Sequence, residues 1–175
     1  MIRHNVWATR ELLKGCVALS DAQWNQEFEI GPGSLRKTLT HIVGAMMRWA
    51  DRISEAELRE SIEDGPQRYT PEELIDLLEV ASEQLGLIAA DIERGAAEGA
   101  WDRRIRFDTP DGKTYLFTRA AALTHVLTHG MHHRAQALNI RRRLGLPPFG
   151  LDLDVVEWEA VQTGQLATTE RDALT

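Results

Sequence analysis

Apolar residues recur along most of this chain at steps of three and four, which is the spacing of one face of an α-helix. Polar residues fill most of the positions between them, so each of these segments is amphipathic. We predict four long helices and one short helix, at residues 3–19, 35–58, 70–94, 119–144 and 153–162. The predicted fold class is therefore all-α, with the long helices forming a bundle.

Residues that start and stop helices stand between these segments. Ser34 is typical of an N-cap, and Thr70 followed by Pro71 places a cap and then a proline at the first helical position. Gly145, with two prolines shortly after it, is typical of a helix end. The connections between the long helices are too long for a simple up-down-up-down bundle, so we expect a crossover connection.

The apolar pattern changes to alternation just before the fourth long helix. Ile105 and Phe107 precede a turn that contains Asp111-Gly112, and Tyr115 and Phe117 follow it. Alternating apolar residues on both sides of an Asp-Gly turn predict a short β-hairpin. The expected architecture is thus a four-helix bundle with a short β-hairpin before the fourth helix and a short C-terminal helix.

At 175 residues the chain is long enough for one domain with a substantial core. We assign residues 1–165 to a single bundle domain and residues 166–175 to a polar C-terminal tail. No apolar run approaches the roughly 18 residues that span a bilayer, so we expect no membrane partner. The first residues also lack the apolar segment of a secretion signal, and we therefore expect a cytoplasmic protein.

Charge and cysteine content narrow the chemistry. The net charge of −7 argues against a nucleic-acid partner, because binding to phosphates depends on an excess of Lys and Arg. The single cysteine, Cys16, excludes an internal disulfide and a zinc site built from cysteines. Cys16 falls within the apolar stripe of the first helix, which favours a core position over a role as nucleophile.

Four of the six histidines lie in the fourth long helix, inside one span of nine residues, 125–133. His129 and His133 are four positions apart, which places two imidazoles on one helical face where both can reach one metal ion. His125 and His129 have the same spacing, so spacing alone leaves two pairings open. His41, in the second long helix, is the candidate for a third ligand from a neighbouring helix. Three imidazoles leave coordination positions open for water or substrate, as catalytic sites require.

The other histidines fit less specific roles. His132 projects about 100° away from His133 on a helix and is better explained by packing or surface exposure. His4 is expected to be a partly buried, hydrogen-bonded residue, and His125 to support the ligands or line a cavity. The sequence contains no H-E-x-x-H, Glu-x-x-His, Gly-rich phosphate loop or G-x-S-x-G motif, which excludes several common enzyme classes.

Three segments of the chain together resemble a known family. They are His4–Ala8 followed by Glu11–Leu13, then 33–42, and then 128–136, where the sequence reads THGMHHRAQ. In these segments the chain resembles the DinB/YfiT-like superfamily of metal-dependent enzymes, and the resemblance covers nearly the whole chain. The family often has His-Arg-Gly-Gln in its last motif, where this chain has Ala135 in place of the glycine.

The resemblance implies a four-helix bundle that binds a divalent transition metal through His41, His129 and His133, and it thereby selects one of the two pairings. It implies zinc or nickel ahead of iron or manganese. Family members of known activity are thiol-dependent transferases or isomerases that use low-molecular-weight thiols such as bacillithiol, mycothiol or glutathione. The expected partners are accordingly a small-molecule substrate, a low-molecular-weight thiol and a second copy of the chain in a homodimer. Trp24, Phe28 and Met47 are spare apolar residues that could supply the dimer contact.

The expected reaction is the transfer of a thiol to an electrophilic small molecule, with the thiol activated as a thiolate. Arg134 and Gln136 adjoin the histidines in sequence, but we assign them no catalytic role. A metal-dependent hydrolase is the first alternative, and its weakness is that the sequence near the ligands offers no evident Asp or Glu as general base. A bundle that binds a metal or a small ligand without catalysis is the second alternative.

Overall fold

The computed structural model describes residues 1–109 and 111–165. It contains six α-helices: α1 (Ile2–Lys14), α2 (Asp21–Asn25), α3 (Leu35–Ser54), α4 (Pro71–Arg94), α5 (Arg119–Arg143) and α6 (Val155–Gln162). A single 3-10 turn, Ala96–Glu98, follows α4, and two strands, β1 (Arg104–Asp108) and β2 (Thr114–Thr118), precede α5. The predicted mostly helical fold, with a hairpin before the fourth long helix and a short C-terminal helix, is confirmed. The predicted polar tail, 166–175, lies outside the described residues.

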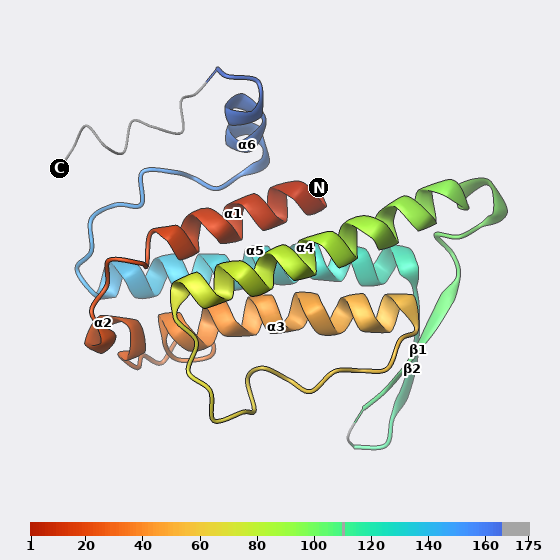
Figure 1. Cartoon of the computed structure of the whole chain (residues 1–175), viewed down its shortest axis with the longest axis horizontal. Helices are drawn as coiled ribbons and strands as arrows, with labels where there is room; N and C mark the ends of the chain where they lie inside the picture. The colour runs from red at the N-terminus through yellow and green to blue at the C-terminus, as the bar shows by residue number, and fades with distance from the viewer. Residues whose placement is uncertain (110, 166–175) are drawn as a thin grey trace.

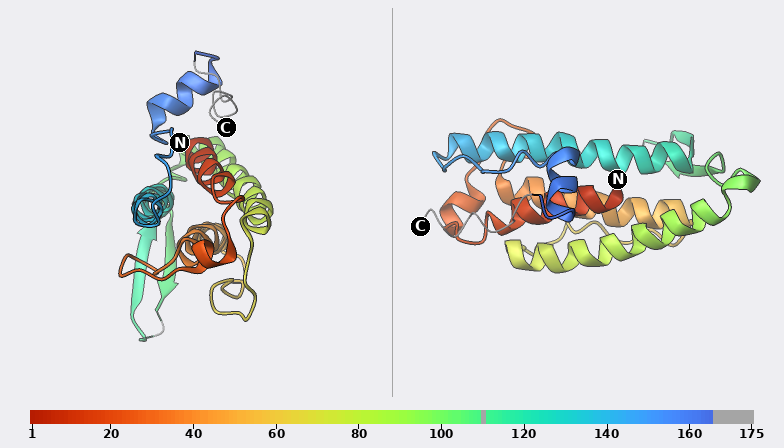
Figure 2. Two further views of the ribbon diagram at one scale, coloured as in Figure 1. Left: turned by 90° about the vertical axis from the view of Figure 1, so that its left-hand side faces the viewer. Right: turned by 90° about the horizontal axis from the view of Figure 1, so that it is seen from above.

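The four long helices α1, α3, α4 and α5 lie side by side around a shared interior (Figures 1 and 2). Following the colour along each helix in Figure 1, α3 and α4 run in one direction while α1 and α5 run in the other. Helix α3 packs against both α4 and α5, and α1 packs against α4 and α5. Because α3 and α4 are parallel, residues 55–70 must return along the length of the bundle, and this is the crossover connection expected from the loop lengths.

Helix ends differ from the prediction at three places, each for a local reason. Helix α1 ends at Lys14 rather than near residue 19, and residues 21–25, predicted as loop, form the short helix α2. Ser20 opens α2 with a capping box, in which Ser20 and Gln23 each accept a backbone N–H of the other. Helix α3 ends at Ser54 rather than at residue 58, because Glu55 adopts a left-handed conformation with φ 57°.

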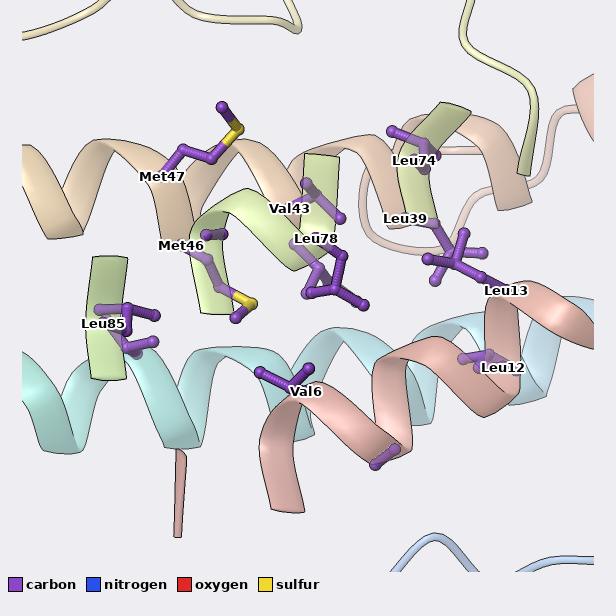
Figure 3. Close-up of a cluster of buried hydrophobic side chains, with 14 of the residues drawn as sticks. Val6, Leu12, Leu13, Leu39, Val43, Met46, Met47, Leu74, Leu78 and Leu85 are labelled. Carbon is purple, nitrogen blue, oxygen red and sulfur yellow. The ribbon is translucent and has the colours of Figure 1, made fainter. Parts of the chain in front are cut away.

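The core consists of Leu, Ile, Val and Met side chains from the inner faces of the long helices, and Figure 3 shows ten of them, labelled, from α1, α3 and α4. Two residues offered as candidate dimer contacts belong to this core: Trp24 is 5% exposed and Met47 is 6% exposed. Phe28 is partly buried against the same cluster. These residues therefore supply little surface for a second copy, and that part of the argument for a dimer was wrong. The homodimer itself stays a prediction.

A buried polar contact sets how α1 lies on α5. Arg134 donates hydrogen bonds to the Asn5 side chain at 2.6 Å and to Thr9 Oγ1 at 3.2 Å. Gly130 lies directly under this contact, where a Cβ atom would collide with the Asn5 and Arg134 side chains. Burial lowers the pKa of Arg134 to about 10, so the side chain still carries its charge at neutral pH. Arg134 therefore holds α5 in register against α1, although its neighbour in sequence is His133.

Candidate metal centre

The packing of α3 against α5 brings His41 next to His129 and His133. Nε2 of His41 lies 3.0 Å from Nε2 of His129, and the three ring centroids are 4.4 to 4.8 Å apart. One nitrogen from each ring lies within 4.8 Å of the other two. Two nitrogens on one ion with metal–nitrogen bonds of ~2.1 Å are about 3.0 to 3.4 Å apart. The His41–His129 pair already has this spacing, and the third ring lies beside it.

Two of the three rings are oriented by an oxygen acceptor that contacts Nδ1, on the opposite edge of the ring from Nε2. Nδ1 of His41 lies 2.7 Å from a carboxylate oxygen of Glu63, and Nδ1 of His133 lies 2.7 Å from Oε1 of Gln136. A carboxylate and an amide oxygen can only accept, so each ring donates its Nδ1–H. The lone pair of each ring is then on Nε2, the atom that a metal ion would bind. The donor set and its tautomers thus fit a metal ion.

Glu63 reaches His41 from the crossover connection, and it was missed in the sequence analysis. Gly44 lets this connection approach α3, because a Cβ atom there would be only 3.0 Å from the Ile62 side chain. Arg59 attaches the connection to α3, because it donates to both carboxylate oxygens of Asp51, with Nε–Oδ2 at 2.7 Å. Glu63 lies 22 positions from His41 in an irregular segment, so no periodic spacing could have associated the two.

Gln136 reaches His133 from one turn further along α5, over the loop that contains Gly31. Gly31 has φ 49°, and a Cβ atom at this position would overlap the Gln136 side-chain amide. The same amide donates its N–H to Nε2 of His132 at 3.0 Å, so His132 is held at the edge of the site. His132 is exposed and does not belong to the group of three histidines that could hold a metal ion, and its predicted place outside the ligand set stays a prediction.

The surroundings of His129 and His133 favour the neutral imidazole, which is the form that binds metals. Burial, together with the neighbouring His133 and His41, lowers the pKa of His129 to about 3. Burial also lowers the pKa of His133, although the hydrogen bond with Gln136 opposes this. The hydrogen bond from His41 holds the pKa of Glu63 below its usual value, so this carboxylate is ionised at neutral pH.

His125 lies one turn before His129 and outside the cluster that could hold a metal. Its ring centroid is 5.3 Å from that of His129 and 4.9 Å from that of Trp49, which stacks on Phe107 of the hairpin. Partial burial lowers the pKa of His125. His4 is buried at the other side of the bundle, with Nε2 2.9 Å from the carbonyl oxygen of Leu153. The structure therefore brings together one of the two histidine pairings, with His41, and leaves the other histidines outside it.

The fold and the site define a helical bundle with a three-histidine cluster that could hold a metal ion. All three histidines are half-buried, and over residues 1–109 and 111–165 no cysteine, aspartate, glutamate or further histidine joins the cluster. The sequence model of the DinB family matches residues 1–171, and the chain belongs to the DinB family. No curated protein matches the chain. Among the described helices, none is both long enough and apolar enough to cross a membrane.

Proposed function

We propose that this protein is a metal-dependent enzyme that transfers a low-molecular-weight thiol to an electrophilic small molecule. His41, His129 and His133 would hold the divalent ion. When bound, such an ion makes a coordinating thiol lose its proton near neutral pH. The sulfur then forms a bond to the electrophilic carbon, and the leaving group departs with its electron pair. With an activated alkene such as maleate, the C=C π bond breaks instead and the neighbouring carbon takes up a proton. The observation that carries the proposal is the half-buried set of three clustered imidazoles, to which the described chain adds no fourth ligand.

The thiol would have to come from a small molecule, because the protein's own cysteine is unsuited to the reaction. Cys16 is 1% exposed in the core, and burial raises the pKa of its thiol to about 11. At neutral pH this thiol is protonated and out of reach of a substrate. Cys16 lies in the core just after the end of α1 and is not part of the histidine cluster.

The position of Glu63 supports a transferase over a hydrolase. Many metal-dependent hydrolases place a general base within reach of the attacking water. Glu63 is the carboxylate beside the histidines, but it accepts from Nδ1 of His41, on the ring edge opposite Nε2. In that position it orients the ring, as acceptors behind metal-binding histidines do. Thiol transfer needs no such base, because the thiol is already deprotonated when it attacks.

The test is a screen of thiols against electrophiles with protein of known metal content. The purified protein would be loaded with zinc, nickel, iron or manganese, and thiol consumption would be followed with glutathione, cysteine, bacillithiol or mycothiol and a chloroarene or an epoxide. We expect metal-dependent consumption with at least one pair and none with His129→Ala. Thiol consumption that His129→Ala retains in full, or a metal-loaded protein that hydrolyses esters and ignores every thiol, would refute the proposal.

A further inference from the structure

A cavity of about 360 Å³ opens beside the histidine cluster, between the start of α3 and the crossover connection. Pro32, Arg36, Lys37 and Thr40 line it on one side. Glu63 and its neighbours in the connection, as far as Arg68, line it on the other. The cavity and the cluster share a wall, because Glu63 holds His41 and because Thr40 precedes His41 in the chain. This volume lies within the range of small-molecule sites.

The lining of this cavity is cationic in a chain whose net charge is −7. Arg36, Lys37 and Arg68 contribute three positive charges, and the carboxylate of Glu63 is occupied by His41. Two of the cations already have acceptors, since Arg36 donates to Asn25 at 2.6 Å and Lys37 pairs with Glu27. Arg68 is exposed and makes no hydrogen bond or ion pair with the residues that the structure describes. Its charge is available to a ligand.

Thr40 supplies a second, independent observation. Thr40 is 4% exposed and is one of the residues that line the cavity, and its buried hydroxyl oxygen has no hydrogen-bond partner in the described chain. A threonine inside a helix commonly donates to the carbonyl four residues earlier, as Thr9 and Thr38 do here. A buried hydroxyl without a partner costs about 1–3 kcal/mol. The cavity also meets the first turn of α3, where the helix dipole is positive, although Ser34 already caps the Lys37 N–H.

We propose that this cavity binds a carboxylate group of the small molecule that reacts at the histidine cluster. Arg68 and the start of α3 would attract the anion, and the Thr40 hydroxyl would donate to it. Pro32, Ile62 and Pro66 in the lining suit a short carbon skeleton rather than a bare inorganic ion. The identity of the ligand as a substrate rests on the proposed function, whereas carboxylate binding in the cavity can be measured without it.

The binding experiment uses succinate as probe and its diamide, succinamide, as the neutral match, titrated at constant ionic strength and followed calorimetrically. We expect succinate to bind and succinamide to bind at least tenfold more weakly. Arg68→Gln should weaken succinate binding about tenfold, as expected for the loss of a charge-assisted hydrogen bond. Arg104→Gln, which removes an exposed cation on the hairpin at the other end of the bundle, should leave it unchanged.

Thr40→Val gives a signature that a merely structural residue would not. It should weaken succinate binding several-fold while leaving the melting temperature of the free protein equal or higher, because it removes a buried hydroxyl without a partner. Succinate that binds Arg68→Gln as well as the wild type, or succinamide or inorganic phosphate that competes equally, would overturn the proposal. Since Thr40 adjoins His41, metal content is measured for each variant and should not change.

Two further experiments distinguish failure of the carboxylate-binding proposal from failure of the proposed thiol transfer. His129→Ala should lose the metal and keep succinate binding, so a protein without thiol chemistry can still pass the binding test. In active protein, glutathione and its diester would be compared as thiols, and maleate and dimethyl maleate as electrophiles. For the substrate that the cavity binds, Arg68→Gln should raise the KM of the free acid and leave the KM of the ester unchanged. For the other substrate, neither KM should change. A KM that rises equally for acids and esters would overturn the assignment.

Discussion

The carboxylate of Glu63 lies 2.7 Å from Nδ1 of His41, although one residue belongs to an irregular connection and the other to the first half of α3. This contact fixes which nitrogen of His41 is free for a metal ion. It also joins the histidine cluster to the cationic cavity, since Glu63 belongs to both. Ligand orientation and substrate binding would therefore depend on the same short segment of chain.

Single replacements of the clustered histidines should remove the metal. His41→Ala, His129→Ala and His133→Ala should each lower the metal content of the purified protein sharply, because each takes away one of three ligands. His132→Ala should retain it, because that ring lies outside the cluster and touches it only from the side, through the Gln136 amide and an edge contact with the His133 ring. The measurement is metal content by mass spectrometry. His125→Ala is the informative control: if it strips the metal while His133→Ala retains it, the assignment of ligands is wrong.

Glu63→Gln should weaken metal binding about 10- to 100-fold without unfolding the protein, because His41 would lose the anionic acceptor that orients it. The matched control is Glu60→Gln, an equal change of charge at an exposed position in the same connection. Competition with a chelator of known affinity measures the effect. Equal metal affinities for the two variants would mean that the contact between Glu63 and His41 does not tune the site.

Gly31→Ala should lower both stability and metal affinity. An alanine in the left-handed region costs about 1 kcal/mol, and at this position the new Cβ atom would also displace the Gln136 amide from His133. Gly99→Ala is the control for backbone strain alone, since Gly99 has φ 79° and nothing within 4 Å of a Cβ position. Chemical denaturation and metal titration of both variants separate the two effects. A loss of metal affinity in Gly99→Ala as large as in Gly31→Ala would contradict the steric argument.

Asp51 should contribute acid-sensitive stability. Burial opposes its ionisation, but hydrogen bonds from the side chain and backbone of Arg59 outweigh this and lower the pKa of Asp51. A lowered pKa means stability that is present above the unfolded value of ~3.9 and lost as pH falls through the folded value. Asp51→Asn should therefore cost about 2 kcal/mol at neutral pH, with the difference shrinking below pH ~4. Denaturation of both proteins across this range tests it, and Asp64→Asn, an exposed neighbour in the connection, should show no such trend.

Cys16 should be inert in the folded protein. With its pKa raised to about 11 by burial, the thiol stays protonated at neutral pH, and its exposed fraction of 1% keeps reagents away. We expect a disulfide reagent to label it only after denaturation, and Cys16→Ala to keep the metal-dependent activity. Rapid labelling of the native protein, or loss of activity in Cys16→Ala at unchanged metal content, would restore Cys16 as a candidate nucleophile.

The apolar periodicity was sufficient to predict the long helices, because a helix that buries one face must place its apolar residues at steps of three and four. Local cap chemistry likewise located the starts of α3 and α4 at Ser34 and Thr70. The same reasoning failed at α2 and at the end of α3. There the outcome depended on a single capping box at Ser20 and a left-handed residue at Glu55, which are too local to produce a period.

The site divides in the same way. The sequence by itself determined that His129 and His133 share a helical face, since their spacing matches one helical turn. It could not choose between that pair and His125 with His129, it could not find Glu63 beside His41, and it gave Gln136 no role although Gln136 is three positions from His133. Those relationships depend on how α3 packs against α5 and on where Gly44 and Gly31 let loops approach. Only the tertiary structure decides them, because contacts between distant segments follow from packing rather than from the periodicity of any one segment.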